Sequence, residues 1–363
     1  MMLAMHMANE LLNPSTALLT LGLAAAAIAV ASLRAKKFIE PDKLPLVGVM
    51  GAFVFAGQMI NFTLPGMPGT SGHLVGSVLL TILLGPSVSI LVITAVLTIQ
   101  CLLFQDGGLL ALGCNIINMG IIPCILGGWL YKTILGPSAN APAWRQYIAA
   151  WFACVIGVTA GATMVPIETA LGDRLTISTA DFLTVMVGVH LLIGFVEGLI
   201  TFTVLAFIRQ TRPEALGLSV AEGAHVKSRL SPRAFAVSLV LTALMLAGVV
   251  SWFASTHPDG LEWAYQEHKY AAGGDSAVKP PSDPIAAVDT WQNKWSLMSD
   301  YGKRSVPLGQ EPAKEEEARK AGASPTWGHP DGWRSLAGIF GTLVTLVVLY
   351  AATSLFRRRK VAT

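Results

Sequence analysis

The sequence predicts an all-α, polytopic membrane protein with about nine transmembrane helices. Apolar residues make up 53% of the 363 residues and charged residues 13%, whereas charged residues are about a quarter of a typical soluble chain. Apolar runs of about 20 residues, the length that a helix needs to cross the hydrocarbon core, recur along the chain. A soluble fold is therefore excluded, because it has nowhere to bury so much apolar surface.

Seven of the apolar runs each predict one membrane-spanning helix. They are Ser15–Leu33, Leu44–Phe62, Leu109–Tyr131, Gln146–Ala170, Phe182–Ile208, Ala234–Ser255 and Ser335–Phe356. A further run, Leu74 to Phe104, is too long for one ordinary helix and is broken by Gly85 and Pro86. We interpret this run as two crossings, of which the first is short.

The basic residues predict the orientation, because cytoplasmic loops carry an excess of Lys and Arg. The cluster that follows the first span is Arg34, Lys36, Lys37 and Lys43. With two crossings between Leu74 and Phe104, the later basic groups fall on the same side: Lys132 with Arg145, the residues between Arg209 and Arg233, and Arg357–Lys360. The N-terminus is then outside and the C-terminus cytoplasmic. A cleaved signal peptide is the alternative for the first span, but its basic cluster follows the apolar run.

Composition divides the chain into three parts. Residues 1–210 form a seven-helix membrane bundle with short loops, and residues 211–233 form a polar cytoplasmic linker. Residues 234–363 contribute two helices that flank a long outside loop, residues 257–333, which is rich in Pro, Gly, Trp and charges. The C-terminal part is thus a separate unit in composition.

Several function classes lack their motifs. The chain has no GxxxxGK[ST] phosphate loop, no HExxH and no GxSxG, so we expect no enzyme and no ATPase within it. Its net charge is +3 and its basic residues flank membrane spans, which argues against a nucleic-acid partner. The four cysteines lie in apolar stretches without CxxC spacing, so neither a disulfide framework nor a zinc site is expected.

Two histidines on the outer face suggest a metal site. His6 precedes the first span, and His73 follows the uncharged Gly- and Pro-rich loop Thr63–Gly72, which can fold into a protein-lined cavity. If the chain starts at Met5, its amine, the amide nitrogen of His6 and Nδ1 of His6 form fused chelate rings. One nitrogen of His73 completes a planar four-nitrogen site, which favours Ni(II) or Cu(II), with Co(II) also compatible. With Met1–Ala4 attached, the amine donor is lost.

Polar side chains in or near the predicted spans are candidates for supporting this site. Gln58, Gln100, Asn115 and Asn118 lie in or at the ends of predicted spans. They either orient the metal loop and its imidazole or form helix-to-helix hydrogen bonds, which are common in membrane bundles. His190 and Glu197 share one face of a later span, where they form a proton relay, a second metal site, a structural contact or a contact with a partner subunit.

These motifs together resemble the CbiM/NikM family, the substrate-specific membrane components of cobalt and nickel energy-coupling-factor (ECF) ABC transporters. The matching segments are Met5-His6, PGTSGHLVG from Pro68, LLGPSVSILV, QCLLFQDGGLLALGCNIINM from Gln100, and HLLIGFVEGLIT from His190. The C-terminal part resembles the CbiN/NikN accessory subunit through PDGLEWA from Pro258. The chain departs from the family by carrying Met1–Ala4 before Met5 and Asn9-Glu10 where an acidic residue is usual.

The resemblance implies that Met5, His6 and His73 hold the metal. It also implies a transmembrane coupling subunit of the CbiQ/NikQ type and cytoplasmic ATPase subunits of the CbiO/NikO type as partners, in the lipid bilayer of the cell (inner) membrane. Ni(II) or Co(II) is then the transported substrate and no permanent cofactor is expected. Two alternatives stay open: a proton-coupled secondary transporter that uses His190 and Glu197, and a membrane scaffold or sensor. The residues do not decide between cobalt and nickel.

Overall fold

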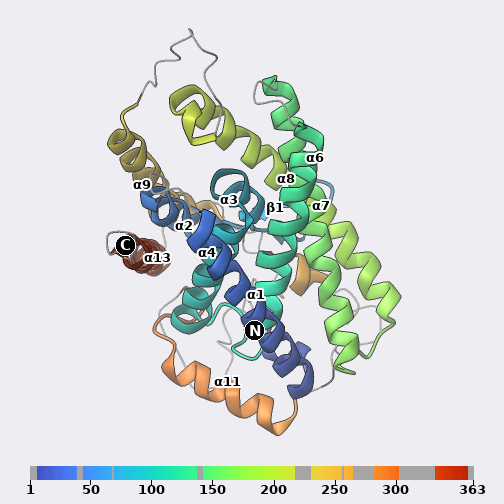
Figure 1. The fold of residues 1–363 in the computed structure, drawn as a ribbon. Coiled ribbons are helices and arrows are strands. Elements are labelled where there is room, and N and C mark those ends of the chain that lie inside the picture. The colour runs from blue at the N-terminus through green and yellow to red at the C-terminus, as the bar shows by residue number, and fades with distance from the viewer. Residues whose placement is uncertain are drawn as a thin grey trace.

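The computed structural model describes residues 6–38, 44–67, 69–136, 142–216, 230–255, 257–264, 279, 281–301 and 332–358. In this part of the chain the fold is a bundle of helices (Figure 1), which confirms the all-α prediction. The exception is one antiparallel hairpin of two-residue strands, β1 (Phe62–Thr63) and β2 (Ser71–Gly72), in which Phe62 pairs with Gly72. This hairpin leads into His73.

The helices follow the apolar runs of the sequence, except for α11, which lies within the predicted outside loop. They are α1 (Pro14–Phe38), α2 (Leu44–Gln58), α3 (Ser77–Leu84), α4 (Pro86–Ile99), α5 (Leu112–Asn115), α6 (Gly128–Leu135), α7 (Ala143–Leu171), α8 (Thr179–Thr211), α9 (Pro232–Gly248), α11 (Asp283–Trp295) and α13 (Gly332–Arg358). Short 3₁₀ or π-helical segments extend or join them: η1 (Asn9–Leu11), η3 (Gln100–Phe104), η4 (Ile116–Ile121), η5 (Pro123–Gly127), η6 (Pro213–Leu216), η7 (Val250–Phe253) and η8 (Ser299–Tyr301).

Six helices within the described residues are long and apolar enough to cross a membrane. They are Pro14–Lys37, Pro86–Phe104, Leu112–Leu135, Ala143–Leu171, Thr179–Thr211 and Gly332–Ser354. Two shorter apolar helices, α2 and α9, have 15 and 17 residues. Leu18, Leu19 and Leu23 on α1 are each more than half exposed, as expected for side chains that face lipid. The chain is a multi-pass membrane protein.

The run from Leu74 to Phe104 is interrupted where its sequence predicts a break. α3 ends at Leu84 and α4 starts at Pro86, because proline removes a backbone donor and is tolerated in the first turn of a helix. α3 has eight residues and is therefore about 12 Å long, well short of the bilayer core. A crossing by this part of the chain therefore needs residues before α3 as well as the helix.

Two predicted spans end too late. The span expected at Ala234–Ser255 ends as α9 at Gly248 and is followed by the 3₁₀ segment η7. The second span was expected to run from Leu44 to Phe62, but α2 ends at Gln58 and Phe62 belongs to β1. The side chain of Gln58 donates a hydrogen bond to the carbonyl of Val75 at 2.8 Å, beyond the hairpin. The apolar composition continues past the helix end because the following residues enter the packed hairpin instead of a helix.

The C-terminal part packs directly on the N-terminal bundle. α13 contacts α2 and α9, and α11 lies beside η1 near the start of the described chain (Figure 1). The main core includes Phe55 on α2 and Phe104 on η3, whose ring centroids are 5.7 Å apart. Gly341 of α13 sits against both rings: a Cβ there would lie 2.1 Å from Cζ of Phe55. Only glycine allows this close approach.

We therefore expect Gly341→Val to detach or strain α13. The added side chain has no room beside two buried rings, and overpacking of this kind costs about 1–3 kcal/mol or more. The measurement is the thermal unfolding midpoint of the purified chain in detergent, with Gly332→Ala on the same helix as the control, since a Cβ at Gly332 meets nothing within 4 Å. Equal midpoints for the two variants would contradict the packing described.

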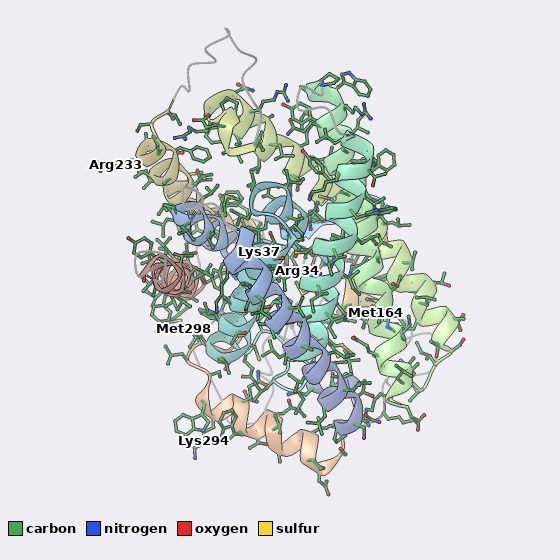
Figure 2. The ribbon with its side chains drawn as sticks, in the orientation of Figure 1. Arg34, Lys37, Met164, Arg233, Lys294 and Met298 are labelled. Atoms are coloured by element: carbon green, nitrogen blue, oxygen red, sulfur yellow. The ribbon has the colours of Figure 1, made fainter. Side chains whose placement is uncertain are left out.

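Two basic residues, Arg233 and Lys294, show how the C-terminal part extends along the bundle. Arg233, at the start of α9, and Lys294, on α11, lie at opposite ends of the molecule (Figure 2). The predicted linker 211–233 is described only at its two ends, and much of the predicted loop 257–333 lies outside the described residues. The described parts of that loop are packed against the bundle.

Candidate metal centre

His6 and His73 come together in the structure. His6 lies just before η1, and His73 follows β2 on the turn into α3. Their ring centroids are 5.5 Å apart with an interplanar angle of 79°, and the residues are 2% and 9% exposed. Met5, the third predicted metal-binding residue, lies outside the described residues.

The two rings border a small cavity. A cavity of about 60 Å³ is lined by His6, His73, Asn115, Asn118 and His190, together with apolar side chains and residues Asp259–Leu261. This volume holds about two water molecules. Nε2 of His6 and both ring nitrogens of His73 are buried without a hydrogen-bond partner. Leaving a buried nitrogen without a hydrogen-bond partner costs free energy, and a bound metal ion would remove that cost. Imidazole nitrogens are also ligands that transition-metal ions prefer.

Carboxylate and phenol groups orient the His6 ring. Nδ1 of His6 lies 2.7 Å from Oδ1 of Asp106, and Tyr301 donates a hydrogen bond to Oδ2 of Asp106 at 2.7 Å. Burial by itself would raise the pKa of Asp106, but His6 and the Tyr301 hydroxyl hold that pKa below its ordinary value. A carboxylate on one imidazole nitrogen fixes the ring and its tautomer, which leaves the other nitrogen, Nε2, as the free donor.

Asn115 holds the backbone next to His6. Its Oδ1 accepts the Met7 N–H at 2.9 Å, and its Nδ2 donates to the Met7 carbonyl at 3.1 Å. The same carbonyl accepts the N–H of Gly108 at 3.0 Å. The N-terminal segment is thus bonded on both sides to the turn that carries Asp106, and Asn115 acts on the site through the backbone.

The segment after His73 is held by two buried side chains. Gln58 donates to the Val75 carbonyl at 2.8 Å, and Glu197 accepts the N–H groups of Val75 and Gly76 at 2.7 and 3.1 Å. Both carboxylate oxygens of Glu197 are therefore occupied by backbone donors. Burial lowers the pKa of His73 to about 3, with the nearby His6 contributing, so His73 is a neutral imidazole, the form that binds metals, at physiological pH.

The other predicted polar residues fall in different places. Asn118 lines the cavity and donates to Glu168 at 2.7 Å. His190 also lines the cavity, and its Nδ1 bonds to the Met186 carbonyl at 2.8 Å. Gln100 is buried with both amide atoms unpaired, and it does not border the cavity. Among the described residues, no three His, Cys, Asp or Glu side chains converge to hold an ion by themselves.

Three residues near the site did not emerge from the sequence as site residues. Asp106 was assigned no role from the sequence. Asp259, from the PDGLE motif, lies with Oδ2 3.9 Å from Nδ1 of His73, and burial raises its pKa well above the ordinary value. Tyr301 had no sequence signal. Asp259 and Tyr301 both come from the C-terminal part of the chain.

The C-terminal part also covers the N-terminal segment. Gln292 of α11 accepts the Leu109 N–H at 2.9 Å and donates to the Gly107 carbonyl at 2.9 Å. Asn9 accepts the Leu110 N–H at 2.7 Å and donates to Asp289 of α11. Helix α11 therefore ties the His6 segment to the turn that carries Asp106.

Two family profiles match the chain. Residues 6–215 match the CbiM family, described as "Cobalt uptake substrate-specific transmembrane region". Residues 233–358 match the PDGLE domain.

Several curated proteins are similar. A putative metal transport protein of Haloquadratum walsbyi is 36% identical over 211 residues, covering 58% of this chain and 92% of that protein. The putative fused nickel transport protein NikMN of Archaeoglobus fulgidus is 38% identical over 221 residues, covering 60% and 70%. The fused nickel transport protein NikMN of Rhodobacter capsulatus is 27% identical over 331 residues, covering 84% and 91%.

Proposed function

The chain belongs to the CbiM family of cobalt uptake substrate-specific transmembrane regions and carries a C-terminal PDGLE domain, and from this we propose that it is the metal-binding membrane subunit of an ATP-driven cobalt or nickel importer. In this role it captures Ni(II) or Co(II) from outside and catalyses no reaction. The named relatives support transport, since the two fused proteins are nickel transport proteins by name.

The observation that carries the proposal is the pair of buried imidazoles. His6 and His73 have three ring nitrogens without partners at one small cavity. Imidazole nitrogen suits Ni, Co, Cu and Zn, and it does not suit Mg or Ca, which take oxygen ligands. A neutral and buried imidazole such as His73 binds a metal without first losing a proton.

In the proposed planar site, four nitrogens surround the ion: the Met5 amine, the His6 amide, Nδ1 of His6 and one nitrogen of His73. The amine donor exists when Met5 is the first residue. Nδ1 of His6 lies 2.7 Å from Oδ1 of Asp106. Formation of the chelate therefore requires His6 to exchange the carboxylate for the metal, and release follows when movement of the 63–72 loop withdraws His73.

The proposed topology has nine crossings, with the N-terminus outside and the C-terminus in the cytoplasm. Arg233 in the cytoplasmic group and Lys294 in the outside loop are expected on opposite sides, and their separation in Figure 2 supports this arrangement. The metal site then lies toward the outer face. The residues before α3, together with α3, supply the short crossing.

The proposed importer needs partners. The sequence has no phosphate-loop motif for ATP, so separate ATPase subunits of the CbiO/NikO type and a coupling subunit of the CbiQ/NikQ type supply the energy. The rival reading is proton-coupled transport through His190 and Glu197. The occupation of both Glu197 oxygens by backbone N–H groups disfavours a relay at that residue.

Calorimetric titration of the detergent-solubilised chain tests the proposal. We expect Ni(II) and Co(II) to bind and Mg(II) and Ca(II) not to bind, because the donors are nitrogens. A chain that starts at Met5 should bind more tightly than one that starts at Met1, since only the first has the free amine. Absence of Ni(II) and Co(II) binding by both chains would refute the function. Metal uptake by this chain without ATPase partners, driven by a pH gradient, would instead support the secondary transporter.

A further inference from the structure

The PDGLE segment of the C-terminal part reaches the cavity between the two histidines. Residues 257–264 lie beside the hairpin that carries His73. The Pro258 carbonyl accepts the Ser71 N–H at 2.8 Å, and the His257 carbonyl accepts the Ser71 hydroxyl at 2.8 Å. The segment is thus fastened to the residues just before His73.

The PDGLE segment packs closely against α8 at Gly260. A Cβ at Gly260 would lie 2.5 Å from Cγ1 of Val189 and 3.0 Å from Cδ1 of Ile193, both on α8. Glycine is therefore required where the segment presses on α8. The contact brings Asp259, the residue before it, to the wall of the cavity.

Asp259 differs from the other carboxylates near the site. Among the described residues that line the cavity, it is the only acidic one, whereas Asp106 is occupied by His6 and Tyr301. Asp259 is 4% exposed. Its Oδ1 accepts the Glu262 N–H at 2.8 Å, and its Oδ2 lies 3.9 Å from Nδ1 of His73.

The 3.9 Å separation is too long for a hydrogen bond but suits a bridging cation. Two ligand atoms that are each about 2.1 Å from one ion lie about 3 Å apart at a right angle and about 4 Å apart when nearly opposed. One ion therefore fits between Oδ2 of Asp259 and Nδ1 of His73 with little movement. A buried divalent ion also needs a negative partner, and the Asp259 carboxyl becomes one when the incoming ion displaces its proton.

We propose that Asp259 is the oxygen ligand that receives the incoming Ni(II) or Co(II) together with His73, before the ion is held by the nitrogen donors. The inference rests on the proposed function and adds to it a role for the C-terminal part in metal binding. One carboxylate and one imidazole form a weak site on their own, which allows the ion to pass on to the stronger nitrogen site.

The purified full chain tests this with variants that separate charge from folding. Asn is as good a cap as Asp for the turn that begins at Asp259, so Asp259→Asn removes the charge and keeps the cap, whereas Asp259→Ala removes both. Glu262→Gln removes a neighbouring buried carboxylate that does not line the cavity and serves as the control. The readouts are Ni(II) and Co(II) affinity, association rate, thermal midpoint and the Co(II) absorption spectrum.

We expect Asp259→Asn to weaken metal binding and slow association about 10–100-fold at an unchanged thermal midpoint, with Glu262→Gln like wild type. Wild-type behaviour of Asp259→Asn, with loss only in Asp259→Ala, would reduce the residue to a cap and overturn the inference. If Asp259→Asn also lowers the thermal midpoint, the Co(II) absorption spectrum during loading decides whether Asp259 is a ligand. A spectrum identical to that of wild type would overturn the inference. Failure of wild type to bind metal at all would instead refute the proposed function.

Discussion

Replacing His73 with alanine is expected to abolish tight Ni(II) and Co(II) binding. The imidazole supplies a donor from the hairpin side of the cavity, opposite the N-terminal segment that carries His6. No other described side chain of the hairpin lines the cavity, so the donor has no local substitute. Loss of a group that only orients a ligand lowers affinity about 10–100-fold, and loss of the ligand itself should exceed that range.

The measurement is calorimetric titration with each metal, repeated as metal uptake in cells that contain the partner subunits. His257→Ala is the matched control, because it removes an imidazole near the same hairpin whose described contacts are made by its backbone. An unchanged thermal midpoint in His73→Ala confirms that binding, and not folding, is lost. Full affinity in His73→Ala would remove the chemical basis of the proposed site.

Replacing Glu197 with alanine should disturb both stability and metal binding. The variant leaves the N–H groups of Val75 and Gly76 buried and unpaired, and each such group costs about 1–3 kcal/mol. The backbone directly after His73 then loses its anchor on α8. We expect a lower thermal midpoint together with weaker Ni(II) binding, and we expect Glu197→Gln, which keeps one acceptor oxygen, to fall between alanine and wild type.

The same pair of variants distinguishes positioning from proton transfer. A proton relay through Glu197 predicts that Glu197→Gln binds metal normally and loses only transport driven by a pH gradient. Positioning predicts weaker binding with no dependence on such a gradient. Glu214→Gln is the control, since that carboxylate is half exposed and pairs with Arg212 away from the cavity. Normal Ni(II) affinity in Glu197→Ala would show that the hairpin holds its place without this residue.

The proposal also assigns the C-terminal part a direct place at the metal site. Asp259 lines the cavity, Tyr301 bonds to the carboxylate that orients His6, and α11 ties down the N-terminal segment. In this arrangement both parts of the chain surround one site. This contact is a physical reason for the two parts to be joined in one chain, because the second part completes the surroundings of residues supplied by the first.

Residues at the ends of helices show where sequence reasoning stopped. The length of each apolar run predicted most helices well, since burial in lipid requires a continuous apolar stretch. The predicted end of α2 was wrong, because an apolar residue such as Phe62 fits a packed hairpin as well as a helix, so composition does not separate the two. The break before Pro86 was predicted correctly, because proline acts through its own local geometry.

The sequence by itself determined the membrane class, the family and the two histidines, because these are written in local composition and in short motifs. Only the tertiary structure decided that Asp106 faces His6, that Glu197 holds the backbone after His73, that Asp259 lines the cavity, and that Tyr301 bonds to Asp106. The partners in these contacts are far apart in the chain and share no periodic pattern. Their meeting depends on how whole helices pack, which is a property of the folded bundle and not of any one segment.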